Sequence, residues 1–280
     1  DNKQKLDDVL NFVVKITLFL SIFSCIEFIL SSNSTRVFLF YPNPNYLGIS
    51  LMFGFSILLF ISSRFKAIKI FVILLAIFMT GSRAIELGVI LLFLLYFFQN
   101  RRELKLKYII ATSLMLALIL GFFWNKIVIN QDNRGVRYGI TKISLNIVDN
   151  NLINGIGYGQ FRTKFSKYFN EEIRALNIVE INNRIDYKEE MMTHNDFLKI
   201  ITELGLFGFS FVLFYSYKLH YEFKKLFANN QEYFYMSISL MIGSLTFSLF
   251  HNNITSFVFW FILFLPFIIN KIYVKDRQSV

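Results

Sequence analysis

The sequence predicts an all-α polytopic membrane protein of about eight transmembrane helices, with one large loop outside the cytoplasm. Two observations carry this prediction. The chain has 280 residues, of which 55% are hydrophobic and 35 are Phe, and its mean hydropathy is +0.49. The apolar residues form runs of about 15 to 20 that lack a polar face, which is typical of helices that contact lipid and one another.

The apolar runs set the expected positions of the transmembrane helices. They are Val9–Leu30, Tyr46–Ser62, Phe65–Thr80, Ala84–Phe98, Tyr108–Trp124, Phe197–Leu219, Tyr233–Phe250 and Ser256–Asn270. The third and fourth runs are separated by Gly81-Ser82-Arg83. One helix over both would be about 50 Å long, well beyond a hydrocarbon core of about 30 Å. We therefore predict a tight helical hairpin at this turn, and a single integral membrane domain over residues 1–280.

Basic residues gather in alternate connectors, which predicts the orientation of the chain. The connectors on one side carry Lys3, Lys5, Arg64, Lys66, Lys69, Arg101, Arg102, Lys105, Lys107, Lys218, Lys224, Lys225, Lys271, Lys275 and Arg277. Because such residues remain in the cytoplasm, we expect both termini there and the loop Asn125–Asp196 outside. The net charge of +10 is thus a topology signal, and nucleic acid is not an expected partner.

The outer loop Asn125–Asp196 has the apolar content of an ordered segment. Within Tyr138–Val148, one face of a predicted amphipathic helix at the membrane interface carries Ile140, Ile143, Leu145 and Ile147. The following Gly155–Gly159 stretch lacks the preceding strand and the acidic residue of a dinucleotide site. We interpret it as a sharp turn that lies close either to other backbone or to a bound phosphate.

Three residues on the outer side are candidates for chemistry, and each has a plain structural alternative. Arg83 stands in otherwise uncharged sequence, where it either meets a ligand or pairs with Glu86 one turn later. Arg137 either binds an anion or is solvated. His194 either acts as a general base or belongs to a loop that caps the next helix. The sequence has no cluster with metal-ligand spacing, so we expect no metal and no cofactor.

Four short motifs occur in a fixed order along the chain. Tyr41–Gly48 is a Pro-Asn loop ahead of a span, and Thr80–Ala84 is a Ser-Arg hairpin turn. Arg137 is followed by the glycine turn Gly155–Phe161, and Thr193–Gly208 combines a His-Asn pair with a helix. Together these motifs resemble the O-antigen ligase/polymerase family, which joins lipid-linked bacterial glycans at the outer face of the cytoplasmic membrane.

The resemblance implies a GT-C type fold and an inverting, metal-independent transfer of a glycan from an undecaprenyl-diphosphate carrier to a sugar hydroxyl. Arg83 and Arg137 would bind the diphosphate, and His194 would deprotonate the acceptor hydroxyl. Residues expected to contribute to substrate binding are Arg134, Asn195, Gly157 and Gly159. The expected partners are the lipid-linked oligosaccharide, a glycan or lipid-core acceptor, and membrane lipid.

Several alternatives stay open at this point. A polymerase that extends the lipid-linked chain and a ligase that transfers the finished chain are not distinguished. A non-enzymatic glycolipid flippase or transporter predicts charges and broken helices near the bilayer midplane, whereas the polar candidates here gather at the outer edge. The predicted spans are also fewer than the ten to twelve usual in the family, which suggests missing N-terminal helices and leaves a truncated, inactive member as a further alternative.

Overall fold

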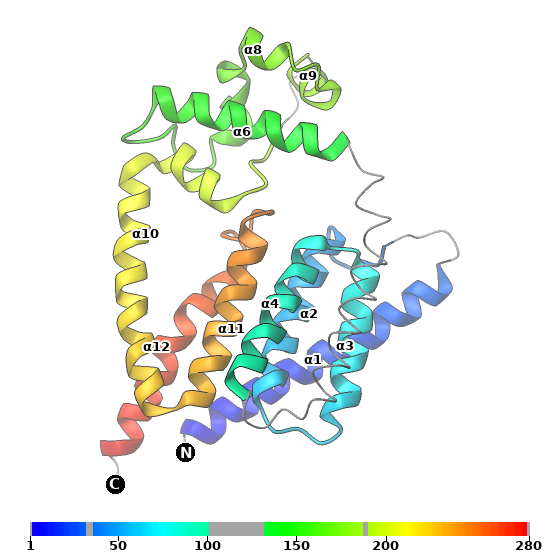
Figure 1. Cartoon of the computed structure of the whole chain (residues 1–280), viewed down its shortest axis with the longest axis vertical. Helices are drawn as coiled ribbons and strands as arrows, with labels where there is room; N and C mark the ends of the chain where they lie inside the picture. The colour runs from blue at the N-terminus through cyan, green and yellow to red at the C-terminus, as the bar shows by residue number, and fades with distance from the viewer. Residues whose placement is uncertain (1, 32–35, 101–131, 187–189, 279–280) are drawn as a thin grey trace. The chain divides into compact units, whose positions relative to one another are not determined.

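The computed structural model describes residues 2–31, 36–100, 132–186 and 190–278. Every regular element in these ranges is a helix (Figure 1), which confirms the predicted all-α class. The chain divides into two compact units. The first contains residues 1–102, 218–247 and 253–280, and the second contains residues 103–217 and 248–252.

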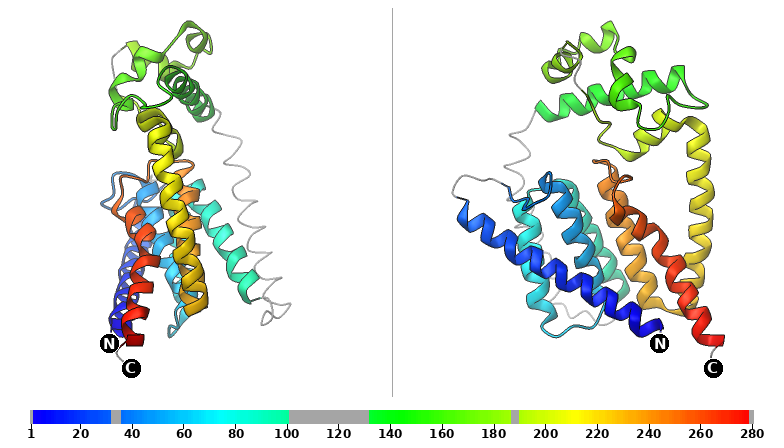
Figure 2. Two further views of the ribbon diagram at one scale, coloured as in Figure 1. Left: turned by 90° about the vertical axis from the view of Figure 1, so that its left-hand side faces the viewer. Right: turned by 180° about the vertical axis from the view of Figure 1, so that it is seen from behind.

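The first unit is a bundle of apolar helices. They are α1 (Asn2–Leu30), α2 (Pro44–Phe60), α3 (Lys66–Thr80), α4 (Arg83–Asn100), α11 (Gln231–Ser248) and α12 (Phe257–Gln278). Helix α1 crosses α2 and α3 obliquely (Figure 2), and α2 also contacts α4. The α1–α2 crossing depends on Gly54, where an added Cβ would lie 1.8 Å from Oγ1 of Thr17. Small residues of this kind allow the close helix approach common in membrane proteins.

A helix covers each predicted span within the described residues, and the fifth span, Tyr108–Trp124, lies outside them. Two helices, α1 and α10 (Asp196–Asn229), are long and apolar enough to cross a bilayer. Helix α2 and the Phe257–Ile272 part of α12 are shorter apolar helices. The number of membrane crossings, the GT-C type fold and the single-domain organisation therefore stay predictions.

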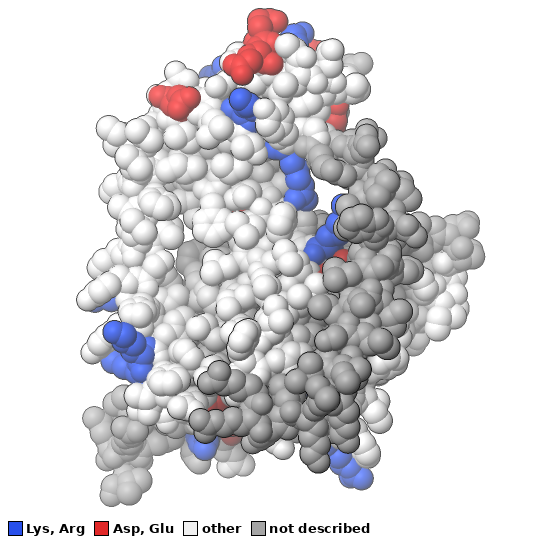
Figure 3. Space-filling model, viewed as in Figure 1, with Lys and Arg blue, Asp and Glu red and all other residues white. Residues whose placement is uncertain are grey.

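The second unit surrounds a separate small core. It contains α6 (Asp132–Asn150), α7 (Phe161–Lys164), the 3-10 helix η1 (Phe165–Tyr168), α8 (Glu171–Arg174), α9 (Val179–Asp186) and residues 196–217 of α10. The core residues are Ile140, Ile143, Ile147, Phe161, Phe165, Ile173, Ile181 and Met191. On the face shown in Figure 3, acidic side chains gather over the end of this unit that carries α8, whose first turn contains Glu171 and Glu172.

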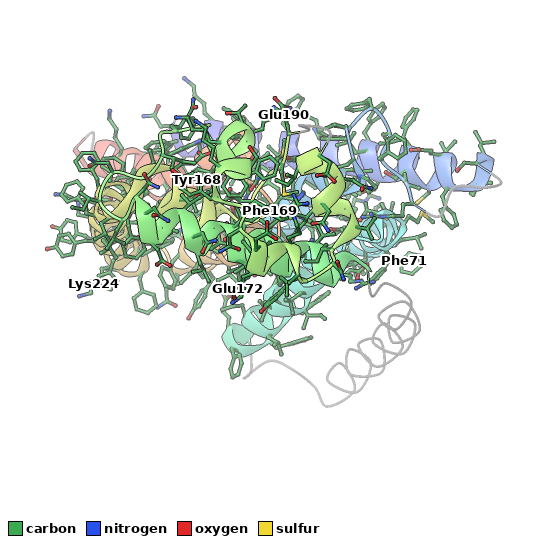
Figure 4. All side chains as sticks on the ribbon, turned by 90° about the horizontal axis from the view of Figure 1, so that it is seen from above. Phe71, Tyr168, Phe169, Glu172, Glu190 and Lys224 are labelled. Carbon is green, nitrogen blue, oxygen red and sulfur yellow. The ribbon has the colours of Figure 1, made fainter. Side chains whose placement is uncertain are left out.

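The predicted amphipathic helix is present as α6 and is longer than predicted. Ile140, Ile143 and Ile147 lie on one face of α6 and are buried in the core of the second unit, while Leu145 is exposed. Neighbouring protein therefore covers these three residues of the apolar stripe, and the placement of α6 at a membrane interface stays a prediction. Tyr168 lies beside α6 (Figure 4), where its carbonyl oxygen accepts a hydrogen bond from Asn146 at 3.1 Å.

Candidate functional site

The predicted hairpin turn in the first unit is confirmed, and it places Arg83 at the start of α4. Helix α3 ends at Thr80, and Gly81 follows with a φ of 59°, a left-handed conformation that favours glycine. The amides of Ile85 and Glu86 both donate to the carbonyl of Ser82 at 3.0 Å, which starts α4. The side chain of Arg83 is exposed at this first turn.

Arg36 lies against the same turn, and we did not identify it from the sequence. Its Nε donates to the carbonyl of Thr80 at 2.7 Å, and its Nη2 donates to Oδ1 of Asn45 at 3.1 Å. Desolvation lowers the pKa of Arg36, the carboxylate of Glu86 opposes this shift, and the positive charge of Arg83 adds to it. Arg36, Arg83 and Glu86 therefore form one electrostatic group, in which a bound anion would offset the repulsion between two guanidinium groups.

The Pro-Asn motif begins α2 and supports this group. Asn43 is the N-cap, with Oδ1 accepting hydrogen bonds from the amides of Asn45 at 3.0 Å and Tyr46 at 3.3 Å. Pro44 occupies the first helical position, where its lack of an N–H costs nothing and its φ already suits a helix. The cap orders the residues that include Asn45, whose side chain holds Arg36.

In the second unit, the glycine turn docks onto the backbone of α10. Gly205 interrupts α10 with a φ of 61° and a ψ of −157°. A Cβ at Gly155 would lie 2.4 Å from the carbonyl carbon of Glu203, and a Cβ at Gly205 would lie 2.4 Å from the carbonyl oxygen of Ile153. Both positions therefore require glycine because two backbone segments meet there.

Glu203 holds the glycine turn in place with its backbone and its side chain. Its carbonyl accepts a hydrogen bond from the amide of Gly157 at 2.9 Å. Its buried carboxylate accepts one from the amide of Gly159 at 2.8 Å and another from that of Phe161 at 3.1 Å. These contacts favour the interpretation of the glycines as a turn close to backbone, and substrate binding by Gly157 and Gly159 stays a prediction.

His194 is fixed by the residues on either side of it. Its φ is 51°, a conformation that costs a non-glycine residue about 1–3 kcal/mol and that persists where neighbouring contacts impose it. Thr193 Oγ1 donates to Oδ1 of Asn252 at 2.9 Å, and Asn195 Nδ2 donates to the carbonyl of Leu249 at 3.0 Å. The Oδ1 of Asn195 accepts hydrogen bonds from the amides of Phe197 and Leu198, so Asn195 is the N-cap of α10.

Arg137 and His194 lie close enough for a Coulombic interaction. The side chain of His194 keeps contact with solvent, but desolvation by the surrounding protein lowers its pKa below the ordinary 6.5. The positive charge of Arg137 lowers this pKa further, Glu180 opposes the shift, and Arg184 adds to it. The guanidinium carbon of Arg137 lies 5.9 Å from the centroid of the Phe250 ring, a cation–π distance.

The structure thus brings Arg137, His194 and Asn195 together in the second unit, while Arg83 belongs to the first unit with Arg36. Arg134 lies in α6, but its side chain is outside the described residues. A cationic group beside a histidine that is neutral near pH 7 can hold an anion and accept a proton from a neighbouring hydroxyl.

Comparison with known proteins gives one family. A family model described as O-antigen ligase matches residues 68–213, just over half of the chain. The matched segment includes Arg83, Arg137, His194 and Glu203, and it excludes Arg36. No curated protein matches the chain.

Proposed function

Because the chain belongs to the O-antigen ligase family, we propose that it is a membrane glycosyltransferase acting at the outer face of the cytoplasmic membrane. The donor is a glycan on an undecaprenyl-diphosphate carrier, and the acceptor is a sugar hydroxyl on a glycan or lipid core. The reaction is an inverting transfer that needs no metal.

The observation that carries this proposal is the proximity of Arg137 to His194. A base in glycosyl transfer must be unprotonated at the working pH, and the lowered pKa of His194 keeps its imidazole neutral. A leaving diphosphate needs cationic partners, and a guanidinium group can bind two of its oxygens at once. Arg137 supplies such a group beside the base, and the family resemblance adds Arg83.

The proposed step balances in atoms and charge. The acceptor oxygen forms a bond to the anomeric carbon of the donor sugar while the bond from that carbon to the phosphate oxygen breaks. The proton of the acceptor hydroxyl goes to the imidazole of His194. Arg83 and Arg137 stabilise the negative charge that develops on the departing diphosphate.

The role of His194 is tested by transfer in vitro from a purified lipid-linked donor. General-base catalysis typically contributes about 10²–10⁴-fold, so His194→Ala should lower the transfer rate by that factor while donor binding changes little. His194→Gln keeps a hydrogen-bonding group but accepts no proton, and should be nearly as slow. Wild-type activity in His194→Gln would contradict the assignment. The metal-free scheme would be wrong if EDTA stopped transfer and Mg²⁺ or Mn²⁺ restored it.

The arginines are tested by the same transfer reaction. Arg83→Ala and Arg137→Ala should abolish transfer in protein that remains folded in the membrane. Lysine at either position should restore only part of the activity, because a point charge cannot form two parallel hydrogen bonds with phosphate. Near-normal transfer by Arg137→Ala at equal expression would return Arg137 to the solvated alternative and make Arg134 the better candidate.

Gel analysis of the surface glycan in a deletion strain distinguishes a polymerase from a ligase. Loss of the ladder with one repeat retained would indicate a polymerase. Complete loss of attached chains, with lipid-linked polymer accumulating, would indicate a ligase.

A further inference from the structure

Exposed apolar side chains gather where the glycine turn meets the break in α10. Ile153 is 68% exposed and Phe207 is 76% exposed, and Leu152 and Leu206 beside them are also exposed. The amide of Leu206 donates to the carbonyl of Leu152 at 2.8 Å, and that of Phe207 donates to the carbonyl of Ile153 at 3.1 Å. These bonds hold the four side chains, which we call the apolar wedge, next to one another. Contiguous apolar patches on a protein surface mark contacts with other proteins, with ligands or with a membrane.

Four backbone hydrogen bonds join the turn to the broken part of α10. In an unbroken helix, Leu206 would donate to Thr202 and Phe207 to Glu203. Here the carbonyls of Thr202 and Glu203 accept hydrogen bonds from the turn, at 3.0 Å from Ile156 and 2.9 Å from Gly157. The turn thus supplies partners for the two amides and the two carbonyls that the helix break separates. Water would meet this need on a soluble surface, but inside a bilayer only protein groups can do so.

The apolar wedge continues into an apolar face of α10. Phe211, Leu213 and Phe214 are exposed, and α10 is apolar enough to cross a membrane, with a mean hydropathy of 1.8 over its most apolar window. Uncharged atoms cover the N-terminal half of α10 on the face shown in Figure 3. The exposed apolar surface of α10 thus extends to the turn, and the hydroxyl of the exposed Ser210 on this surface donates to the carbonyl of Phe207 at 2.7 Å.

We propose that Leu152, Ile153, Leu206 and Phe207 insert among the acyl chains of the outer leaflet. This inference rests on the proposed membrane placement of α10. It makes the glycine turn part of the membrane boundary, although the sequence places it in an extramembrane loop. The wedge then fixes the depth of the short helical segment Asp196–Leu204 relative to the headgroups, where a lipid-linked diphosphate lies. This segment begins two residues after His194.

Spin-label accessibility in vesicles tests this inference without using enzymatic activity. Cys25 is the only cysteine, so Cys25→Ser provides the background for single-cysteine variants. Ile153→Cys reports on the wedge. Val179→Cys is the matched control in α9, because Val179 is 69% exposed. Leu213→Cys is the reference on α10. Each variant is labelled with a nitroxide and reconstituted into dioleoylphosphatidylcholine vesicles, and collision rates with oxygen and with a water-soluble nickel chelate are measured.

We expect the label at Ile153→Cys to resemble that at Leu213→Cys, with an oxygen-to-nickel collision ratio several-fold above that at Val179→Cys. Leu152→Cys, at a position that is 47% exposed, should give the same result and serves as the second reporter if Ile153→Cys fails to fold. A ratio at both wedge positions equal to that at Val179→Cys would overturn the inference. Low collision rates with both probes would also overturn it, because the wedge would then be covered by protein. An aqueous signal at Leu213→Cys would instead contradict the membrane placement of α10 and the proposed function with it.

Discussion

His194 has a strained left-handed backbone conformation, and hydrogen bonds from both of its neighbours hold it there. The residue before it bonds to Asn252 and the residue after it bonds to Leu249, so the backbone has little freedom to relax. Each hydrogen bond contributes a net stabilisation of about 1 kcal/mol, which is comparable to the cost of a left-handed conformation at a non-glycine residue. The direction of the His194 side chain is consequently set by contacts far along the chain, which is the preorganisation that a general base requires.

The pKa of His194 should respond in opposite directions to two substitutions. Arg137→Ala removes a positive charge and should raise the pKa, which should still lie below 6.5 because desolvation is the larger cause. Glu180→Gln removes a negative charge and should lower it. NMR titration of histidine-labelled protein in micelles measures both shifts, with His194→Gln assigning the resonance. No shift in either variant would mean that these side chains are not close to His194 in solution.

The rate of transfer should show the same titration. Protonation inactivates a base, so activity should fall as the pH drops through the pKa of His194, and this acid limb should lie below pH 6.5. Glu180→Gln should move the limb to lower pH. An acid limb above pH 6.5, or one that Glu180→Gln leaves in place, would argue against His194 as the base.

The residues of the site differ in how readily they can be identified from the sequence. The sequence identifies His194 and Arg137 by their place in the predicted topology and by the motifs to which they belong. Arg36 could have been found, since it is the only charged residue in Ser31–Asn45. Asn252 and Phe250 could not, because their role depends on a contact between segments more than fifty residues apart in the chain.

At the scale of elements, the glycine turn and α10 form one unit of structure. The spacing of Gly155, Gly157 and Gly159 predicted a turn, and the possibility of nearby backbone was part of that prediction. The sequence did not identify the partner, because a helix break at Gly205 leaves no periodic signal. Likewise, the apolar stripe of α6 indicated that one face is covered, but periodicity does not distinguish a protein core from a membrane interface.

Two glycine substitutions should separate steric from conformational cost. Gly159→Ala meets no atom within 4 Å, but its φ is 74°, so it should lower the free energy of unfolding by about 1–2 kcal/mol. Gly155 has a similar φ of 64°, and a Cβ there would also overlap the backbone of Glu203. Beyond the conformational cost, Gly155→Ala should therefore lower the free energy of unfolding by a further amount of about 1–3 kcal/mol because of overpacking. Unfolding of purified protein in micelles, followed by circular dichroism, measures both. Equal effects would mean that the turn does not dock on α10 as described.

At the scale of the whole molecule, composition predicted the all-α class, and the ordered motifs predicted the family, which the family match confirms. Within the described residues, the structure has a helix at each span that hydropathy predicts. Hydropathy alone does not show how many of these helices cross the bilayer, because short apolar helices also fill protein cores. Orientation depends instead on the distribution of Lys and Arg.

Reporter fusions test the predicted orientation directly. A fluorescent protein that matures only in the cytoplasm should be bright after Arg102 and after Lys225, because basic connectors remain inside. Alkaline phosphatase, which is active only outside, should be active when fused at Asn177, within the long loop. The reciprocal fusion at each position is the control for expression. A cytoplasmic signal at Asn177 would place Arg137 and His194 on the side where the lipid-linked donor is not presented, and the proposed transfer reaction would then be wrong even if both residues proved essential.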